Sequence, residues 1–224
     1  YKYYHKAFNG HSFADGIAVL TAAITFAYLG LIFCYLFLRQ IGFSKKVSFY
    51  STFAVFLGLY LTSYTFEQPG YSHLYEFFAY SAFLYFFTKF FFVRASKYLY
   101  LASIFAGLLV LIRIVDAALL LPPFLFVLYK MRSKKILIIT GLILGFFASF
   151  LFLYNYISYG NPFTVGYSTS NQSGFSLGIN IINLLFSDTR GLLIWSPLVV
   201  LSVIGLALYS KKSKVALVFF LLPT

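Results

Sequence analysis

The sequence has 224 residues, of which 61% are hydrophobic, 23% aromatic and only 10% charged, and its formal net charge is +12. A soluble domain needs roughly 25% charged residues to cover its surface. The composition therefore excludes a disordered chain, a nucleic-acid-binding module and a typical cytosolic enzyme. It indicates an all-α, polytopic membrane protein whose outer surface contacts lipid.

Several apolar runs are long enough to cross a bilayer, which takes about 20 helical residues. In chain order these runs cover residues 16–38, 47–64, 74–92, 136–157 and 191–209, and a further run begins at 215. We expect residues 1–224 to form one transmembrane helical bundle of about seven or eight spanning or half-spanning helices. Because the sequence opens at Tyr1 and stops within an apolar run, we also expect a fragment truncated at both ends.

The basic residues fall mostly in alternate loops between these runs. Thirteen of the 17 Lys and Arg residues would lie on one face: Arg39, Lys45, Lys46, Lys89, Arg94, Lys97, Lys130, Arg132, Lys134, Lys135, Lys211, Lys212 and Lys214. Lysine and arginine are enriched in the cytoplasmic loops of membrane proteins, so we expect this face to be cytoplasmic. The positive charge then reflects topology, and we expect no nucleic-acid partner.

The acidic residues and histidines fall toward the opposite face. They are Asp15, Glu67, Glu76, Asp116, Asp188, His5, His11 and His73. Groups able to transfer protons or bind a metal thus gather at the outer leaflet. His73 and Glu76 are three residues apart, as two metal ligands on a helix could be, but two ligands are too few to predict a metal site. Glu76 would also favour a helix N-terminus through the helix dipole.

The apolar stretch 99–129 is interrupted by Arg113 and Asp116. Basic residues flank both of its ends, so an even number of crossings is favoured, with a turn near Arg113 and a return leg disturbed by Pro122 and Pro123. A charged side chain at bilayer depth costs roughly 3 kcal/mol, which predicts an outward-open, wet cavity around the tip. An ion pair between Arg113 and Asp116 that only neutralises both charges is the alternative.

Residues 158–190 form the longest polar segment, which we expect to be an outer loop. Long loops without a pattern of their own are often functional. Within this loop, apolar residues at helical spacing predict a short helix lying in the membrane interface: Ile179, Ile182, Leu185 and Phe186.

Three stretches resemble the multi-span GT-C glycosyltransferases, especially the bacterial relatives of protein O-mannosyltransferases. They are residues 67–73 (EQPGYSH), Arg113 with Pro122 in a hairpin after Gly107, and residues 161–167 with 186–191 and 196–197. The likeness covers most of the chain. It implies an enzyme of the bacterial cell envelope that moves a monosaccharide from a polyprenyl-phosphate donor to a glycan, lipid or protein acceptor on the extracytoplasmic side of the cytoplasmic membrane.

The resemblance also implies roles for particular residues. The family's catalytic acid follows the first span in an outer loop that is missing here, so we expect the base to lie upstream and assign none. Arg113 and Arg190 would stabilise the departing phosphate, and Glu67 and His73 would position the acceptor or a metal. The remaining candidates for substrate binding are Asp116, Tyr167 and Asp188. No cofactor is certain, and a divalent metal is possible.

The sequence is compatible with two other functions. A transporter or lipid flippase could use Arg113 and Asp116 as a substrate site near the middle of the membrane. A membrane scaffold without chemistry is the third reading, although it gives no purpose to the outward gathering of carboxylates and histidines. Inverted repeats would favour the transporter, and the sequence shows none.

Overall fold

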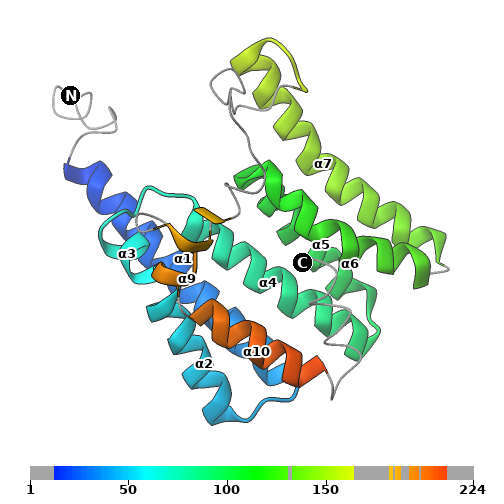
Figure 1. Cartoon of the computed structure of the whole chain (residues 1–224). Helices are drawn as coiled ribbons and strands as arrows, with labels where there is room; N and C mark the ends of the chain where they lie inside the picture. Colours follow the sequence, from blue (N-terminus) through cyan, green and yellow to red (C-terminus); the bar gives the residue numbers. More distant parts are fainter. Residues whose placement is uncertain are drawn as a thin grey trace. The chain divides into compact units, whose positions relative to one another are not determined.

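The computed structural model describes residues 13–130, 133–163, 182–183, 185–187, 192–196 and 198–210. Within these ranges all regular structure is helical, which confirms the prediction of an all-α protein (Figure 1). The chain divides into two compact units, Tyr1–Arg113 and Ile114–Thr224, which are described separately. The expectation of one helical domain over 1–224 stays a prediction.

The first unit is built around a long central helix. Its elements are α1 (Phe13–Gln40), α2 (Lys45–Gly58), α3 (Leu61–Phe66), α4 (His73–Val93) and α5 (Ser96–Ile112). Helix α4 packs against both α1 and α5, and α2 and α3 pack against α1. Helix α4 runs parallel to α1, because Phe26 of α1 meets Tyr75 near the start of α4 and Gln40 meets Thr88 near its end. It runs antiparallel to α5. The end of α1, the start of α2, the end of α4 and the start of α5 therefore lie together at one end of the unit.

The contact between α1 and α4 depends on a small residue. A Cβ atom added to Gly30 would lie 2.6 Å from the Phe77 ring and 3.2 Å from the Phe78 Cα. Glycine therefore lets the two helices approach closely. Farther along, the Phe33 ring lies 5.6 Å from Phe86 and 6.1 Å from Phe105, so aromatic rings join α1, α4 and α5 in one core. These contacts hold α1, α4 and α5 in register with one another.

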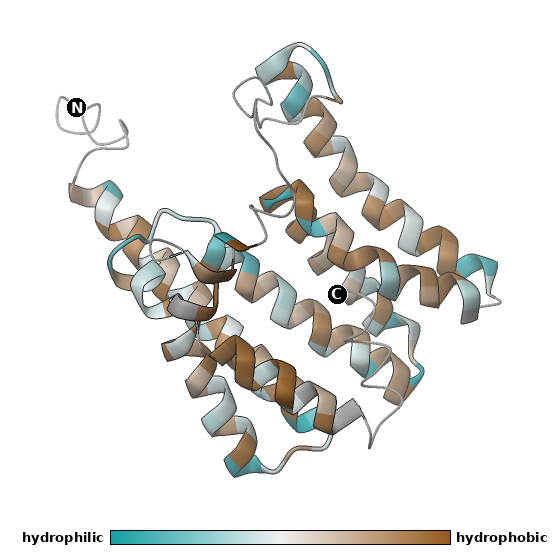
Figure 2. Ribbon diagram, in the orientation of Figure 1, coloured by the Kyte–Doolittle hydropathy of each residue, from teal (hydrophilic) through white to brown (hydrophobic). Residues whose placement is uncertain are grey.

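Three helices are long and apolar enough to cross a membrane: α1, α4 and α7 (Lys134–Tyr159). They confirm three of the predicted runs, 16–38, 74–92 and 136–157. Only 17%, 39% and 6% of their most apolar windows are buried within the protein. Helices that are hydrophobic on all sides and yet unburied are typical of a membrane protein, whose exposed apolar residues contact lipid. Figure 2 shows hydrophobic residues along the helices and hydrophilic residues mainly near their ends.

The prediction of one continuous helix over 47–64 is wrong. The helix ends at Gly58, and α3 begins after Tyr60, whose φ of 60° is left-handed. Glycine is a poor helix former, and a left-handed residue cannot continue a right-handed helix. The 14 residues of α2 are about 21 Å long, which is shorter than the hydrocarbon core of a bilayer. The break places α3 beside the start of α4.

The described elements of the second unit are the 3₁₀ turn η2 (Ile114–Asp116), α6 (Ala117–Lys130), α7, α9 (Leu192–Trp195) and α10 (Leu198–Ser210). The predicted interruption of 99–129 is confirmed, because α5 ends at Ile112 and α6 begins after η2. The expected turn of the second leg back across the membrane stays a prediction. Pro122 and Pro123 lie inside α6 and do not end it.

The predicted outer loop 158–190 is only partly described. Helix α7 continues through Tyr159 and ends at Gly160, whose φ of 71° is the left-handed cap that glycine favours. Of the predicted interfacial helix, residues 182, 183, 185 and 186 are helical. The rest of that prediction lies outside the described residues.

Candidate functional site

The candidate site lies at the end of the first unit where α3 meets the start of α4. The connection 67–72 brings the chain from α3 into α4, whose first turn carries His73 and Glu76. Helix α5 runs antiparallel to α4, so Arg113, which caps the C-terminus of α5, reaches the same end. Arg113 leaves the helix with extended backbone (φ −149°, ψ 116°).

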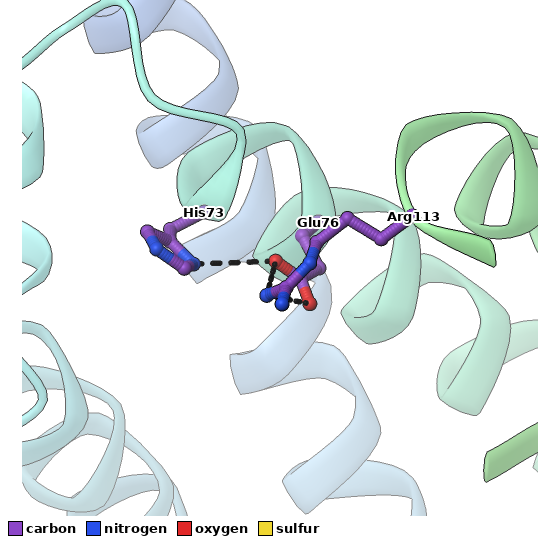
Figure 3. A network of polar contacts seen from close by, with 3 residues as sticks. All are labelled: His73, Glu76 and Arg113. Atoms are coloured by element: carbon purple, nitrogen blue, oxygen red, sulfur yellow. Dashed lines mark hydrogen bonds and ion pairs between the residues drawn. The ribbon is translucent and has the colours of Figure 1, made fainter. Parts of the chain in front are cut away.

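Glu76 contacts both Arg113 and His73. One terminal nitrogen of Arg113 (Nη1) lies 3.3 Å from both Glu76 carboxylate oxygens, and His73 Nδ1 lies 3.3 Å from Glu76 Oε2 (Figure 3). The side chains are half-buried, with exposed fractions of 36% for His73, 20% for Glu76 and 32% for Arg113. Water still reaches the network, so its electrostatic contribution to stability is small, about 1 kcal/mol or less per pair.

Aromatic rings border this network. The Tyr64 ring centre lies 4.5 Å from that of His73, and the Tyr71 ring is nearly parallel to the imidazole, at 5° and 6.3 Å. Tyr71 is 56% exposed. We call Tyr64, Tyr71 and His73 the ring cluster. Exposed aromatic faces beside a carboxylate and a guanidinium combine an apolar stacking surface with hydrogen-bonding groups.

Glu67 belongs to the same end of the unit. It is the C-terminal cap of α3, and the Ser63 hydroxyl donates a hydrogen bond of 2.6 Å to its Oε2. This bond holds the carboxylate against the last turn of α3. The site therefore presents two acceptors of fixed position, Glu67 and Glu76, together with the donor Arg113.

The arrangement offers little to a metal ion. In the part of the chain that the structure describes, no group of three or more His, Cys, Asp and Glu residues could hold one. His73 and Glu76 supply two donor atoms, and the Arg113 cation next to them would repel a second positive charge. The chemistry that these residues can perform is hydrogen bonding to hydroxyl and phosphate oxygens, and proton exchange at the imidazole.

The predicted site residues have different outcomes. His73 and Arg113 are brought together through Glu76, and Glu67 lies at the same end of the unit. Asp116 belongs to the second unit, where it is buried with 6% exposure, so its place relative to Arg113 and the ring cluster is not defined. Three candidates lie outside the described residues: Tyr167, Asp188 and Arg190.

Sequence reasoning did not assign Glu76, Tyr64 or Tyr71 to the site. The three-residue spacing of His73 and Glu76 was a usable signal, because residues at that spacing face the same side of a helix. The Glu76–Arg113 pair spans 37 positions and depends on how α4 and α5 pack, which no local pattern encodes.

Comparison of the chain with protein-family models, with curated proteins and with solved structures gives no match.

Proposed function

We propose that the chain belongs to a membrane glycosyltransferase of the GT-C type, which moves a monosaccharide from a polyprenyl-phosphate donor to an acceptor on the extracytoplasmic side of a bacterial cytoplasmic membrane. One observation carries the proposal. Glu76 contacts both Arg113 and His73 beside the exposed Tyr71 ring. These residues lie at one end of the first unit, and the lysines that the structure describes in this unit lie at its other end.

The guanidinium of Arg113 suits the leaving phosphate. Transfer of a sugar from a lipid phosphate leaves negative charge on the phosphate oxygens, and a planar guanidinium donates hydrogen bonds that match those oxygens. Glu76 keeps this guanidinium at the membrane-helix end before the donor arrives. An arriving phosphate would accept hydrogen bonds from the guanidinium beside the carboxylate, so the donor group is already oriented when negative charge develops on the phosphate.

The remaining groups suit a carbohydrate. Sugar rings carry apolar C–H faces that pack on aromatic rings and hydroxyl groups that bond to carboxylates. With His73 Nδ1 directed at Glu76, the Nδ1–H tautomer is favoured, and the Nε2 atom can accept a hydrogen bond from a sugar hydroxyl. The base that deprotonates the acceptor is not among the residues assigned here.

The test is sugar transfer by the purified protein in liposomes that contain a radiolabelled polyprenyl-phosphate sugar. We expect Arg113→Ala to lower the rate of transfer at least tenfold while the yield of folded protein is kept. Lys134→Ala is the matched control, since it removes an exposed cation far along the chain and should leave transfer unchanged. Equal loss in both variants, or no transfer from any polyprenyl-phosphate donor by the wild type, would refute the proposal.

A transporter is the second candidate, favoured by a specific observation. The helical path breaks after Ile112, and the charged residues Arg113 and Asp116 lie within four positions of this break in the sequence. Discontinuous helices with charged residues at the break often form the substrate sites of transporters. The same liposomes separate the two functions, because a transporter would move solute across the bilayer without releasing polyprenyl phosphate from the donor.

A further inference from the structure

The end of the first unit opposite the candidate site carries a cluster of basic side chains. The Gln40 side-chain nitrogen donates a 2.9 Å hydrogen bond to the Thr88 hydroxyl, so the α1–α2 turn lies beside the α4–α5 turn. We call the basic residues of these two turns the basic-end cluster. They are Arg39, Lys45, Lys46, Lys89, Arg94 and Lys97.

The described part of the first unit supplies this cluster with no nearby carboxylate. Its acidic residues are Asp15, Glu67 and Glu76, and each belongs to the opposite end of its helix. Glu76 precedes Lys89 by almost four helical turns, or roughly 20 Å along α4. That separation is far greater than the distance of about 4 Å in an ion pair, so Glu76 does not pair with Lys89.

The helix dipoles add to the positive potential. Lys45 and Lys46 lie in the first turn of α2, and Lys97 lies in the first turn of α5. Cations are disfavoured at helix N-termini, where the free backbone N–H groups already attract anions. The N-cap residue of α5, Ala95, provides no side-chain hydrogen bond to those N–H groups. Both the side chains and the backbone at this end therefore favour a bound anion.

Lys89 is held in place by aromatic groups. Its ammonium group donates a 2.6 Å hydrogen bond to the Tyr85 hydroxyl and lies 4.8 Å and 5.0 Å from the ring centres of Tyr85 and Tyr98. The ammonium group of Lys97 lies 5.2 Å from the same Tyr98 ring. Both ammonium groups thus contact one ring, and an anion bound between them would be attracted to both charges.

The surroundings of the cluster point to a lipid. Phe92 and Val93, which directly precede Arg94, are 59% and 53% exposed on a helix apolar enough to span a membrane. Acyl chains would lie along these apolar residues while the headgroup reaches the cations at the helix end. The long side chain of Lys89 can extend from the membrane interior toward the headgroups in the same way.

We propose that Lys89, Arg94 and Lys97, together with the N-terminus of α5, bind the phosphate of an anionic phospholipid. Clusters of basic residues at the membrane end of helices are attracted to anionic lipid headgroups, and the contribution of each charge corresponds to about a fivefold change in affinity. The aromatic contacts of Lys89 make this a defined site at one turn rather than a diffuse attraction to the whole surface. The proposal does not depend on the proposed transferase activity.

Retention of lipid by the purified protein in detergent tests this site. Phosphatidylglycerol and phosphatidylcholine are titrated separately, and bound lipid is counted by native mass spectrometry. We expect phosphatidylglycerol to bind at least tenfold more tightly than phosphatidylcholine. Lys97→Gln, which changes an exposed residue, and Lys89→Gln should each weaken phosphatidylglycerol binding about fivefold. Lys89→Arg should keep most of it.

Lys134→Gln is the matched control, because Lys134 is also an exposed lysine in the first turn of a helix but has no part in the basic-end cluster. We expect it to change binding less than twofold. Equal binding of the two lipids, or equal loss in Lys134→Gln and Lys97→Gln, would overturn the proposal. Displacement of phosphatidylglycerol by millimolar inorganic phosphate would show a site for free phosphate instead of a lipid.

Discussion

Glu76 is the residue on which the candidate site depends, because its carboxylate contacts both His73 and Arg113. Removing it leaves a half-buried guanidinium without this partner at the end of an apolar helix. The cost is limited by water, since Glu76 is 20% and Arg113 32% exposed. The network therefore acts mainly by positioning Arg113 and His73, and only weakly by stabilising the fold.

A double-mutant cycle measures this balance. We expect Glu76→Gln and Arg113→Gln each to lower the free energy of unfolding by about 1 kcal/mol, and the double variant to lose less than the sum, with a coupling of about 0.5–1 kcal/mol. Unfolding in a denaturing detergent, followed by circular dichroism, gives the four values. Strict additivity would show that the two charges do not interact in solution.

Arg94 has a left-handed backbone conformation that is unfavourable for arginine, and its side chain is part of the proposed lipid site. It caps α4 with φ at 58°, and its N–H donates to the Phe90 carbonyl oxygen at 2.8 Å. Glycine or asparagine adopts this left-handed conformation at lower cost. We expect Arg94→Gly to raise the free energy of unfolding by about 0.5–1 kcal/mol and to weaken phosphatidylglycerol binding. Thermal unfolding and lipid retention, measured on the same sample, separate the two effects.

Arg94→Asn provides the control for this substitution, because asparagine also tolerates the left-handed region but has a side chain. It should gain stability and lose lipid as the glycine variant does. A loss of stability in both variants would mean that the Arg94 side chain stabilises the fold directly. That result would contradict a role for Arg94 in lipid binding alone.

At the scale of the helices, the packing of α1 on α4 depends on Gly30. We expect Gly30→Ala to lower the free energy of unfolding by about 1–3 kcal/mol, because the new methyl group meets the Phe77 ring at 2.6 Å and the backbone of Phe78 at 3.2 Å. Gly141→Ala is the matched control. Gly141 lies inside α7 with nothing within 4 Å of an added Cβ, so alanine should be neutral or gain up to about 1 kcal/mol.

A second substitution confirms the cause. Adding Phe77→Leu to Gly30→Ala removes the ring that the methyl group meets, and we expect it to recover part of the lost stability. If Gly30→Ala is as stable as the wild type, or if the double variant is simply the sum of two losses, α1 and α4 do not approach as closely at Gly30 as the structure indicates.

The helices themselves were largely predictable. Long apolar runs set α1, α4 and α7, because a run of that length has no other stable state in lipid. The break after α5 was also predictable, since Arg113 and Asp116 interrupt an apolar stretch between two basic clusters. The division of 47–64 into α2 and α3 was not, because a tyrosine gives no local signal for the left-handed backbone found at Tyr60.

The candidate site was predictable only in part, for the same reason. His73 and Glu67 stood out as polar residues in an outer turn, whereas the pairing of Glu76 with Arg113 needs the side-by-side placement of α4 and α5. The ring cluster was equally hidden. The sequence has 20 tyrosines and does not indicate which of them lie near His73. Tyr64 and Tyr71 reach the imidazole because α3 and the α3–α4 turn lie beside the start of α4.

For the whole molecule, the central question is which side of the membrane each end of the helices faces. In the first unit, the basic-end cluster and the His73–Glu76–Arg113 network lie at opposite ends of α4. Lysines and arginines remain preferentially on the cytoplasmic side during insertion. We therefore expect the basic-end cluster to face the cytoplasm and the candidate site to face outward, as a transferase that uses a donor on the outer leaflet requires.

Thiol labelling tests this orientation directly. Cys34 is the only cysteine, so Cys34→Ala gives a cysteine-free background into which Gln68→Cys, Lys97→Cys and Lys134→Cys are introduced one at a time. All three positions are exposed. We expect a membrane-impermeant maleimide added to intact cells to label position 68 and to reach positions 97 and 134 only after the membrane is opened. Labelling of positions 68 and 97 from the same side would place both ends of α4 in one compartment, which a helix that crosses the bilayer does not allow. Labelling of 97 and 134 from outside, with 68 protected, would instead put the candidate site in the cytoplasm and remove it from the outer leaflet.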